Sequence, residues 1–289
     1  MFDLFAAFKT ELAPWLTLAV SQIYLAIPIL VIAFVRHGRA SLRWSAGLLH
    51  SVRINLSFLV LNRLLAPLIG FFGGLGAKSA LGLGLPQLPE VFWQDVPLAL
   101  RIFIGILLSE LAVYWAHRFL HTPWLWPIHA VHHSDRHMNM FTADRAHILE
   151  RLLTSFIVAF CLFMADVPMA GAALVFLLIN FHDAYIHARL DIDHGPFNLV
   201  IASPRFHQWH HADEPAAYGK NVGILTGLWD WVFGTYYNPG PVSAPLGVKE
   251  VRGESFVGLL VYPFKAWAGM AHAHMDRSAS KPDAPLTES

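Results

Sequence analysis

Charge is scarce in this chain of 289 residues. Only 14% of its residues are Asp, Glu, Lys or Arg, whereas 55% are hydrophobic. Ordinary soluble domains carry about 25% charged residues. So few charged side chains cannot cover the surface of a folded chain, and part of that surface is expected to face lipid. The composition also excludes disorder for most of the chain, because disorder depends on low hydrophobicity and high net charge.

Cysteine is nearly absent, and the two signs of charge balance. A single cysteine, Cys161, excludes disulfide scaffolds and thiolate metal sites. Twenty basic and twenty acidic residues leave no net field to attract nucleic acid, so no nucleic-acid partner is expected. The motifs HExxH, GxSxG, Walker A and GxGxxG are missing as well. The glycine-rich run at 70–76 lacks the Lys and Ser/Thr of a phosphate-binding loop, and we interpret it as the exit turn of a membrane span.

Long apolar runs predict an all-α membrane protein with about four hydrophobic helical elements. The first three expected spans are 15–35, 54–74 and 97–116. The fourth element, 152–187, is broken by Asp166 and Pro168 into two apolar pieces. This break favours a helical hairpin that enters the membrane and returns to the same side, although two short or tilted spans would have the same ends.

Basic residues predict the orientation of these elements. The segment 36–53 contains four arginines, whereas 75–95 contains only Lys78. The segment 36–53 is therefore expected on the cytoplasmic side, and the chain returns to that side after the third span. Residues 117–150 and 188–250 would then form one cytoplasmic helical cap.

Histidine is the residue in excess. Thirteen of seventeen histidines lie between 117 and 211, mostly in the runs HRFLH, HAVHH and HQWHH. The histidines of these runs are His117, His121, His129, His132, His133, His207, His210 and His211. They stand at i and i+4 in the first run and at i, i+3 and i+4 in the other two, a spacing that predicts rings on the same side of a helix. His182 and His187 lie at the returning end of the expected hairpin.

Neutral imidazole suits zinc, copper, iron and nickel, and one tetrahedral zinc needs only four ligands. Nine patterned histidines are too many for one ion and about right for two, so they predict a dinuclear metal site in the cap. Glu110 and Asp230 are candidates to accept the second N–H of a ligating ring, with a plain structural role as the alternative. His137, His147 and His194 are more easily explained as structural residues.

Other polar residues near these runs are interpreted as a solvated rim: Asp135, Arg136, Arg145, Asp213 and Glu214. An alternative role for Arg136 or Lys220 is to dock an acidic electron donor. The tryptophans at 115, 124, 126 and 209 could line a substrate tunnel or form an interfacial aromatic belt.

Four segments within about 105–240 carry a specific pattern: ELAVYWAHRFLH, VHHSDRHMNMFTADRAHILE, PRFHQWHH and NVGILTGLWDWVFGTYY. Together they resemble the fatty acid hydroxylase / sterol desaturase superfamily of integral-membrane di-iron oxidases. The resemblance implies two iron ions, O2 as co-substrate, a lipid substrate and an external electron donor of the ferredoxin or cytochrome b5 kind. It implies as metal ligands the eight histidines of the three runs and His187. Asp183 stands where relatives carry His or a water-linked Asn, so His182 and Asp183 could each be direct ligands, water-mediated ligands or neither.

The expected organisation has four parts. These are N-terminal transmembrane helices at 1–95, a histidine-box, hydroxylase-like catalytic region at 96–250, an interfacial helix at 251–275 and a disordered tail at 276–289. The expected function is hydroxylation or desaturation of a lipid C–H bond by a multi-pass membrane protein with its metal site on the cytoplasmic side. The alternatives are a membrane metal-binding or transport protein and a scaffold held by structural zinc.

Overall fold

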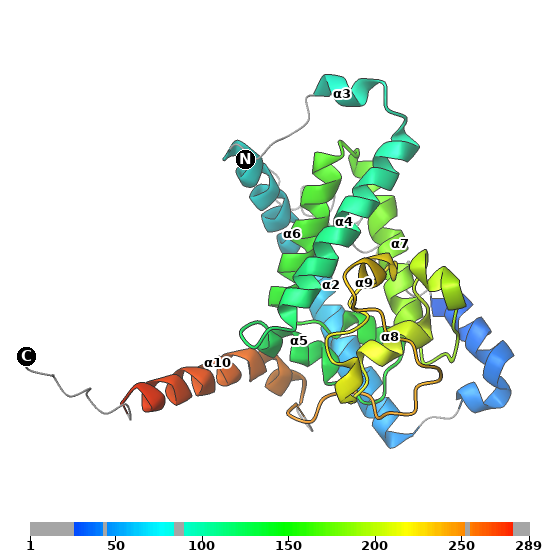
Figure 1. The fold of residues 1–289 in the computed structure, drawn as a ribbon, viewed down its shortest axis with the longest axis vertical. Helices are drawn as coiled ribbons and strands as arrows, with labels where there is room; N and C mark the ends of the chain where they lie inside the picture. The colour runs from blue at the N-terminus through cyan, green and yellow to red at the C-terminus, as the bar shows by residue number, and fades with distance from the viewer. Residues whose placement is uncertain (1–25, 43–44, 84–89, 252–254, 280–289) are drawn as a thin grey trace, which may run out of the picture.

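The computed structural model describes residues 26–42, 45–83, 90–251 and 255–279. These residues contain no β-strand, only one isolated antiparallel bridge between Ala212 and Leu246. The expected all-α class is therefore confirmed for the described part of the chain (Figure 1). Of the expected first span, 15–25 lies outside the described residues and 26–35 is helical.

The longer helices form a bundle, and short helices form the region at its lower end in Figure 1. The α-helices are α2 (Ala46–Gly82), α3 (Glu90–Gln94), α4 (Leu98–Leu120), α5 (Trp126–His133), α6 (Ile148–Met164), α7 (Met169–His187), α8 (Pro204–His210), α9 (Leu228–Val232) and α10 (Phe256–Ala279). The 3-10 helices are η1 (Gly38–Leu42), η2 (Met140–Asp144), η3 (Gly195–Leu199) and η4 (Pro215–Ala217).

Two helices of the described residues are long and apolar enough to cross a membrane, Leu98–Leu120 and Ala170–His187. The first covers the expected span 97–116. Large apolar side chains on these helices are half exposed, among them Phe103 (55%) and Leu178 (50%). Such exposure suits contact with lipid rather than water.

The expected hairpin consists of α6 and α7, joined by a short turn. Asp166 adopts a left-handed conformation with φ 49°, and Pro168 precedes the first residue of α7. Arg101 of α4 lies 2.5 Å from the Asp166 carboxylate, which ties the turn to the neighbouring helix. Below the turn, Val113 of α4 packs in one apolar cluster with residues of α6 and α7, including Leu162.

α2 is longer than the expected span at 54–74. It begins at Ala46, so the second half of the expected loop 36–53 is helical, and it continues to Gly82 through the glycine-rich run. That run is therefore not an exit turn. An ideal Cβ on Gly76 would lie 3.1 Å from the ring of Phe156 in α6, so the missing side chain permits close helix packing. This packing offsets the roughly 1 kcal/mol by which glycine weakens a helix.

Asp135 and Arg145, expected in a solvated rim, are buried at 1% and 5% exposure. The Asp135 carboxylate accepts hydrogen bonds from Ser51 and Asn55 of α2 and from Thr142 of η2. Burial alone would raise the pKa of Asp135, but Arg145 and these three side chains hold it below its usual range. These polar residues of α2 and η2 therefore anchor the segment that follows α5.

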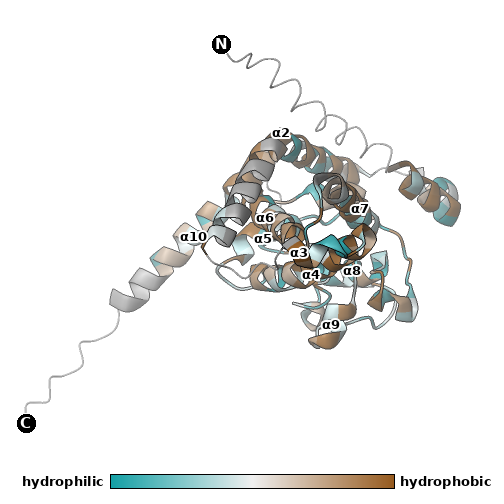
Figure 2. Cartoon of the chain, turned by 90° about the horizontal axis from the view of Figure 1, so that it is seen from above, coloured by the Kyte–Doolittle hydropathy of each residue, from teal (hydrophilic) through white to brown (hydrophobic). Residues whose placement is uncertain are grey.

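α10 packs its first turns against the bundle and then projects away from it (Figure 2). Phe256 meets Phe58 of α2 edge to face at 5.0 Å, and Leu259 is fully buried in the same cluster. The helix continues to Ala279, so the tail expected to start at 276 begins as helix, and 280–289 lie outside the described residues. The expected interfacial position of this helix remains a prediction.

Replacing Gly105 by Leu is expected to destabilise the bundle. An ideal Cβ at this position would lie 3.0 Å from Leu162 and 3.3 Å from Val167, so a larger side chain overpacks the contact between α4 and the hairpin. We expect a loss of about 1–3 kcal/mol, seen as a lower melting temperature in detergent. The matched control is Gly269→Leu in α10, where nothing lies within 4 Å. Equal melting temperatures for the two variants would contradict the packing.

Candidate metal centre

All nine histidines expected as ligands converge in the structure, in two groups. Within each group one ligand-capable atom from every residue lies within 4.8 Å of the others. The first group is His117, His121, His129, His133 and His210, and the second is His132, His187, His207 and His211. We call them the five-histidine cluster and the four-histidine cluster.

Each HxxHH run divides its rings between the two clusters. In α5, His129 and His133 enter the five-histidine cluster, whereas His132 enters the four-histidine cluster. At α8 the division is reversed, because His207 and His211 enter the four-histidine cluster and His210 enters the other. On a helix, the ring at i+4 points about 40° to one side of the ring at i, and the ring at i+3 points about 60° to the other side. One short helix can therefore serve two adjacent sites.

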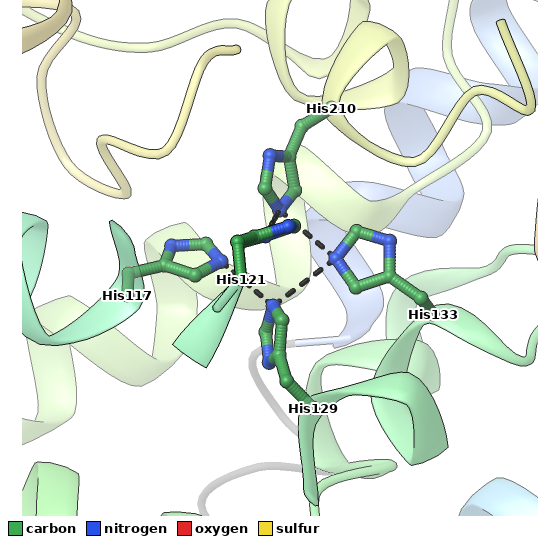
Figure 3. Close-up of side chains that lie close together, drawn as sticks. All are labelled: His117, His121, His129, His133 and His210. Carbon is green, nitrogen blue, oxygen red and sulfur yellow. Dashed lines mark hydrogen bonds between the residues drawn. The ribbon is translucent and has the colours of Figure 1, made fainter. Parts of the chain in front are cut away.

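Figure 3 shows the Nε2 atoms of the five-histidine cluster pointing toward one another. The Nε2 of His129 lies 2.9 Å from that of His117 and 3.1 Å from that of His133. The Nε2 of His210 lies 3.0 Å from that of His133 and 3.3 Å from that of His121. Helices α4, α5 and α8 thus direct five ring nitrogens into one small volume.

The four-histidine cluster repeats this geometry beside it. The Nε2 of His187, the last residue of α7, lies 3.1 Å from that of His132 and 3.0 Å from that of His207. The Nε2 of His211 lies 3.2 Å from that of His207. The rings of His133 and His211 stack with centroids 4.4 Å apart, so the two clusters touch.

Backbone carbonyls orient two rings of the five-histidine cluster. The Nδ1 of His117 lies 2.6 Å from the carbonyl oxygen of Val222, and the Nδ1 of His210 lies 2.8 Å from that of Lys220. A carbonyl oxygen can only accept, so each Nδ1 carries the proton of the neutral ring. Each Nε2 is then an unprotonated lone pair that faces into the cluster.

Carboxylates orient one ring in each cluster. The Nδ1 of His129 donates to Glu150 at 3.0 Å, and the Nδ1 of His187 lies 3.1 Å from a carboxylate oxygen of Asp183. His117 and His129 therefore both hold their protons on Nδ1, although their Nε2 atoms are only 2.9 Å apart. Two lone pairs at this distance repel each other unless a cation lies between them.

Burial keeps the rings neutral. It lowers the pKa well below the usual value for the seven cluster histidines outside the candidate spans. These residues are His121, His129, His132, His133, His207, His210 and His211. Neutral rings with inward lone pairs are the form that binds transition metals. The donor set thus fits two metal ions, one in each cluster.

His182 and Asp183 lie outside both clusters. Asp183 contacts a cluster ring, since its backbone carbonyl accepts from the Nδ1 of His187 at 2.7 Å and its carboxylate lies 3.1 Å from the same atom. His182 is buried, and its Nε2 has no hydrogen-bond partner. The geometry gives Asp183 a role behind a ligand rather than in direct contact with the metal.

Glu110 and Asp230, expected beside the ligating rings, instead hold a loop. Glu110 accepts from the backbone N–H of Leu225, and Asp230 accepts from those of Val222 and Gly223. The carbonyl of the same Val222 accepts the Nδ1 proton of His117. Both acids therefore act on the five-histidine cluster through this loop and do not contact a ring of either cluster.

Sequence reasoning missed Glu150. It lies in the first turn of α6 and is only 9% exposed. The available signal was an acidic residue at the start of an otherwise apolar helix, three residues after His147. His147 itself has a structural role, because its Nδ1 caps the same helix at the N–H of Leu149.

The four tryptophans have different environments. Trp124 is 69% exposed and Trp209 is 5% exposed, with its Nε1 donating to the carbonyl of Gly240. The ring of Trp126 lies 5.3 Å from that of His121 and 5.2 Å from that of His133. Only Trp126 therefore covers rings of the five-histidine cluster.

Replacing Glu150 by Gln is expected to weaken metal binding at the five-histidine cluster. The variant keeps an oxygen for the Nδ1 proton of His129 but removes the negative charge, and loss of such a partner typically costs 10–100-fold in metal affinity. Transfer of metal to a chelator, followed by absorbance, measures the change. Glu214→Gln, which alters an acid outside the clusters, is the matched control. Identical release from both variants would contradict the assigned role.

Acidification is expected to destabilise the metal-free protein. Unfolded histidine titrates near pH 6.5, whereas the buried rings stay neutral well below that pH. Below about pH 6.5 the unfolded state therefore binds more protons, and the free energy of unfolding falls by up to about 1.4 kcal/mol per fully buried ring for each pH unit. Melting temperatures at pH 7.5 and 5.5 measure this loss. The double variant His37→Gln/His50→Gln, which removes two exposed histidines, should show the same loss, and a pH-independent melting temperature would contradict the prediction.

Comparisons with known proteins agree with this site. Residues 102–235 match the family model described as "Fatty acid hydroxylase". Ornithine lipid hydroxylase OlsE of Rhizobium tropici is 30% identical over 210 residues, which are 66% of this chain and 62% of the relative. An alkylglycerol monooxygenase of Danio rerio is 28% identical over 61% of this chain and 39% of its own length. A probable Delta(7)-sterol 5(6)-desaturase of Neurospora crassa is 29% identical over 46% of this chain and 37% of its own length.

The chain thus spans about three fifths of the hydroxylase and about two fifths of the monooxygenase. No solved structure matches it significantly. The family match includes all nine histidines of the two clusters, so both clusters lie inside the matched region. Residues 102–235 therefore form a fatty acid hydroxylase domain, and the chain is similar to a lipid hydroxylase, a monooxygenase and a sterol desaturase.

Proposed function

We propose that this protein is a membrane-embedded, O2-dependent di-iron enzyme that hydroxylates a lipid. One observation carries the proposal: nine imidazoles, eight of them buried, aim their Nε2 atoms at two adjacent points inside a fatty acid hydroxylase domain. As the ligands of the two ions we propose all nine residues of the five-histidine and four-histidine clusters. Glu150 and Asp183 would complete the site from behind His129 and His187.

Hydroxylation of a C–H bond has a fixed balance. The substrate C–H, O2, two electrons and two protons give the alcohol and one water. Side chains supply no oxidant strong enough for an unactivated C–H bond, and two bound iron ions would supply that chemistry. The electrons must come from an external donor, which we propose to be a ferredoxin-like or cytochrome b5-like protein.

The residues of the chain would hold and shield the reacting centre. Carbonyls of Val222 and Lys220 keep the protons of His117 and His210 on Nδ1, so their Nε2 atoms remain free to bind metal. All cluster rings except that of His121 are buried. A buried centre excludes bulk water and so protects a strong oxidant from side reactions.

A lipid is the proposed substrate because the apolar helices α4 and α7 end at the clusters, where His117 and His187 lie. A lipid held between helices could bring a C–H bond to this point from within the bilayer. The relatives named for ornithine lipid and alkylglycerol make these two lipids the first to test. We favour hydroxylation over desaturation, although both reactions begin with removal of a hydrogen atom.

We propose a multi-pass arrangement with the metal centre on the cytoplasmic side. Arg36 donates to the carbonyl of Asp191 at 2.7 Å, and Ser51 donates to Asp135, which follows α5. The arginine-rich segment 36–53 thus lies at the end of the bundle that carries the clusters. Arginine-rich loops favour the cytoplasmic side.

The competing functions fit the geometry less well. Transporter sites lie near the middle of their spans, whereas these clusters lie at the ends of α4 and α7. Structural zinc is four-coordinate, whereas one cluster offers five histidines. A transport or structural-zinc role therefore has weaker support than an oxidase.

The variants His132→Ala and His210→Ala test the proposal in the two clusters separately. Each is expected to lose one bound iron and at least 100-fold in lipid hydroxylation, while remaining in the membrane fraction. The measurement combines iron content with mass spectrometry of ornithine lipid and alkylglycerol after incubation with 18O2, a reductant and a donor protein. His37→Ala, an exposed histidine outside the clusters, is the control. Wild-type turnover by either cluster variant, or two tightly bound zinc ions under iron-rich growth, would overturn it.

A further inference from the structure

A basic pocket of about 410 Å³ lies at the end of the bundle that carries the metal clusters. Its walls are Arg136 and His137 after α5, Arg189 after α7, and the segment 244–246.

Positive charge in this pocket is not neutralised by neighbouring acids. Arg136 and Arg189 are exposed, and neither forms a salt bridge in the described part of the chain. The acids closest in sequence have other partners: Asp191 pairs with Arg205 at 2.8 Å. Asp135 is buried beneath the surface among polar side chains. The pocket therefore offers two guanidinium groups to an anionic partner.

The two residues that follow the pocket segment 244–246 are hydrogen-bonded to one histidine of each cluster. Gly247 donates its backbone N–H to the carbonyl of His211 at 3.0 Å, and Val248 donates to the carbonyl of His133 at 3.1 Å. Gly247 has φ +86°, and an ideal Cβ there would lie 2.8 Å from Arg136, so the segment packs tightly on the pocket wall. The backbone next to the pocket thus contacts the backbone of a ligand candidate in each cluster.

We propose that this basic pocket is the docking site for an acidic electron-transfer protein that delivers the two electrons of the reaction. The inference rests on the proposed function, which requires such a donor, and identifies where it binds. Charge complementarity selects the occupant, because acidic partners are steered to uncompensated arginines. The hydrogen bonds to His211 and His133 add a short path from the pocket to each cluster. Electron-transfer complexes are small and transient, so a shallow basic pocket is enough to position the donor.

Binding of an acidic plant-type [2Fe–2S] ferredoxin to the full chain in detergent provides the first test. The double variant Arg136→Gln/Arg189→Gln is expected to weaken binding at low ionic strength about tenfold or more, and to flatten the salt dependence. The matched control, Arg53→Gln/Lys265→Gln, also removes two exposed positive charges but leaves the pocket intact. This readout does not depend on metal loading or on turnover.

The rate of reduction of the iron-loaded protein provides the second test. Reduction by ferredoxin should slow about tenfold or more in the pocket variant, whereas reduction by dithionite, which needs no docking site, should be unchanged. Product formation with dithionite tests the proposed function separately, since a protein without oxygenase activity gives none even when its metals are reduced. If the pocket variant does not bind ferredoxin but still hydroxylates the lipid with dithionite, the result concerns the pocket and leaves the proposed function intact.

Three outcomes would overturn the proposal. The first is wild-type binding and reduction in the pocket variant. The second is a wild-type protein that dithionite reduces but that accepts electrons neither from ferredoxin nor from a cytochrome b5 domain. The third is a variant with normal ferredoxin binding but reduced affinity for vesicles that contain phosphatidylglycerol, which would make the pocket a site for anionic lipid headgroups.

Discussion

Repulsion between inward-facing imidazole nitrogens is the constraint on which the rest of this structure depends. Neighbouring Nε2 atoms lie 2.9–3.3 Å apart in both clusters. Where a carbonyl or a carboxylate takes the Nδ1 proton, no proton is left to bridge a pair. Cations remove this repulsion, so the fold must position the rings before metal binds and the metal must then stabilise the fold.

The surrounding polar network serves this positioning. Asn62 of α2 donates to the carbonyls of Asp144 and Ala146, and Asn55 of the same helix donates to Asp135. These contacts fix the two ends of the segment that connects α5 to α6. They therefore also fix the positions of His132 in α5 and Glu150 in α6 relative to each other. Polar residues inside an expected membrane span thus have a specific purpose, because they organise the loop that supports the clusters. Their burial is tolerated because each is hydrogen-bonded.

Substrate and electrons are proposed to reach the clusters by separate routes. The apolar helices α4 and α7 would deliver a lipid from the bilayer, whereas the basic pocket at Arg136 and Arg189 would receive an acidic donor from water. With separate routes, electrons would reach the buried metal centre without opening the route taken by the lipid. Water is thereby kept from the reacting centre during both events.

The sequence alone determined the all-α class, the hairpin at 152–187 and the nine histidines, because these features depend on local periodicity. Apolar run length predicts a span, and a spacing of three or four residues places rings on one helix face. Spacing does not predict how the three histidines of one run are divided between the two clusters. Rings at i, i+3 and i+4 spread over about 100° around the helix axis, and the neighbouring helices decide which cluster each ring enters. The partner role of Glu150, and the burial of Asp135 and Arg145, were likewise decided only by tertiary structure. A carboxylate's role depends on which distant group it meets, and that group is 21 residues away for Glu150 and 80 residues away for the contact of Asp135 with Asn55.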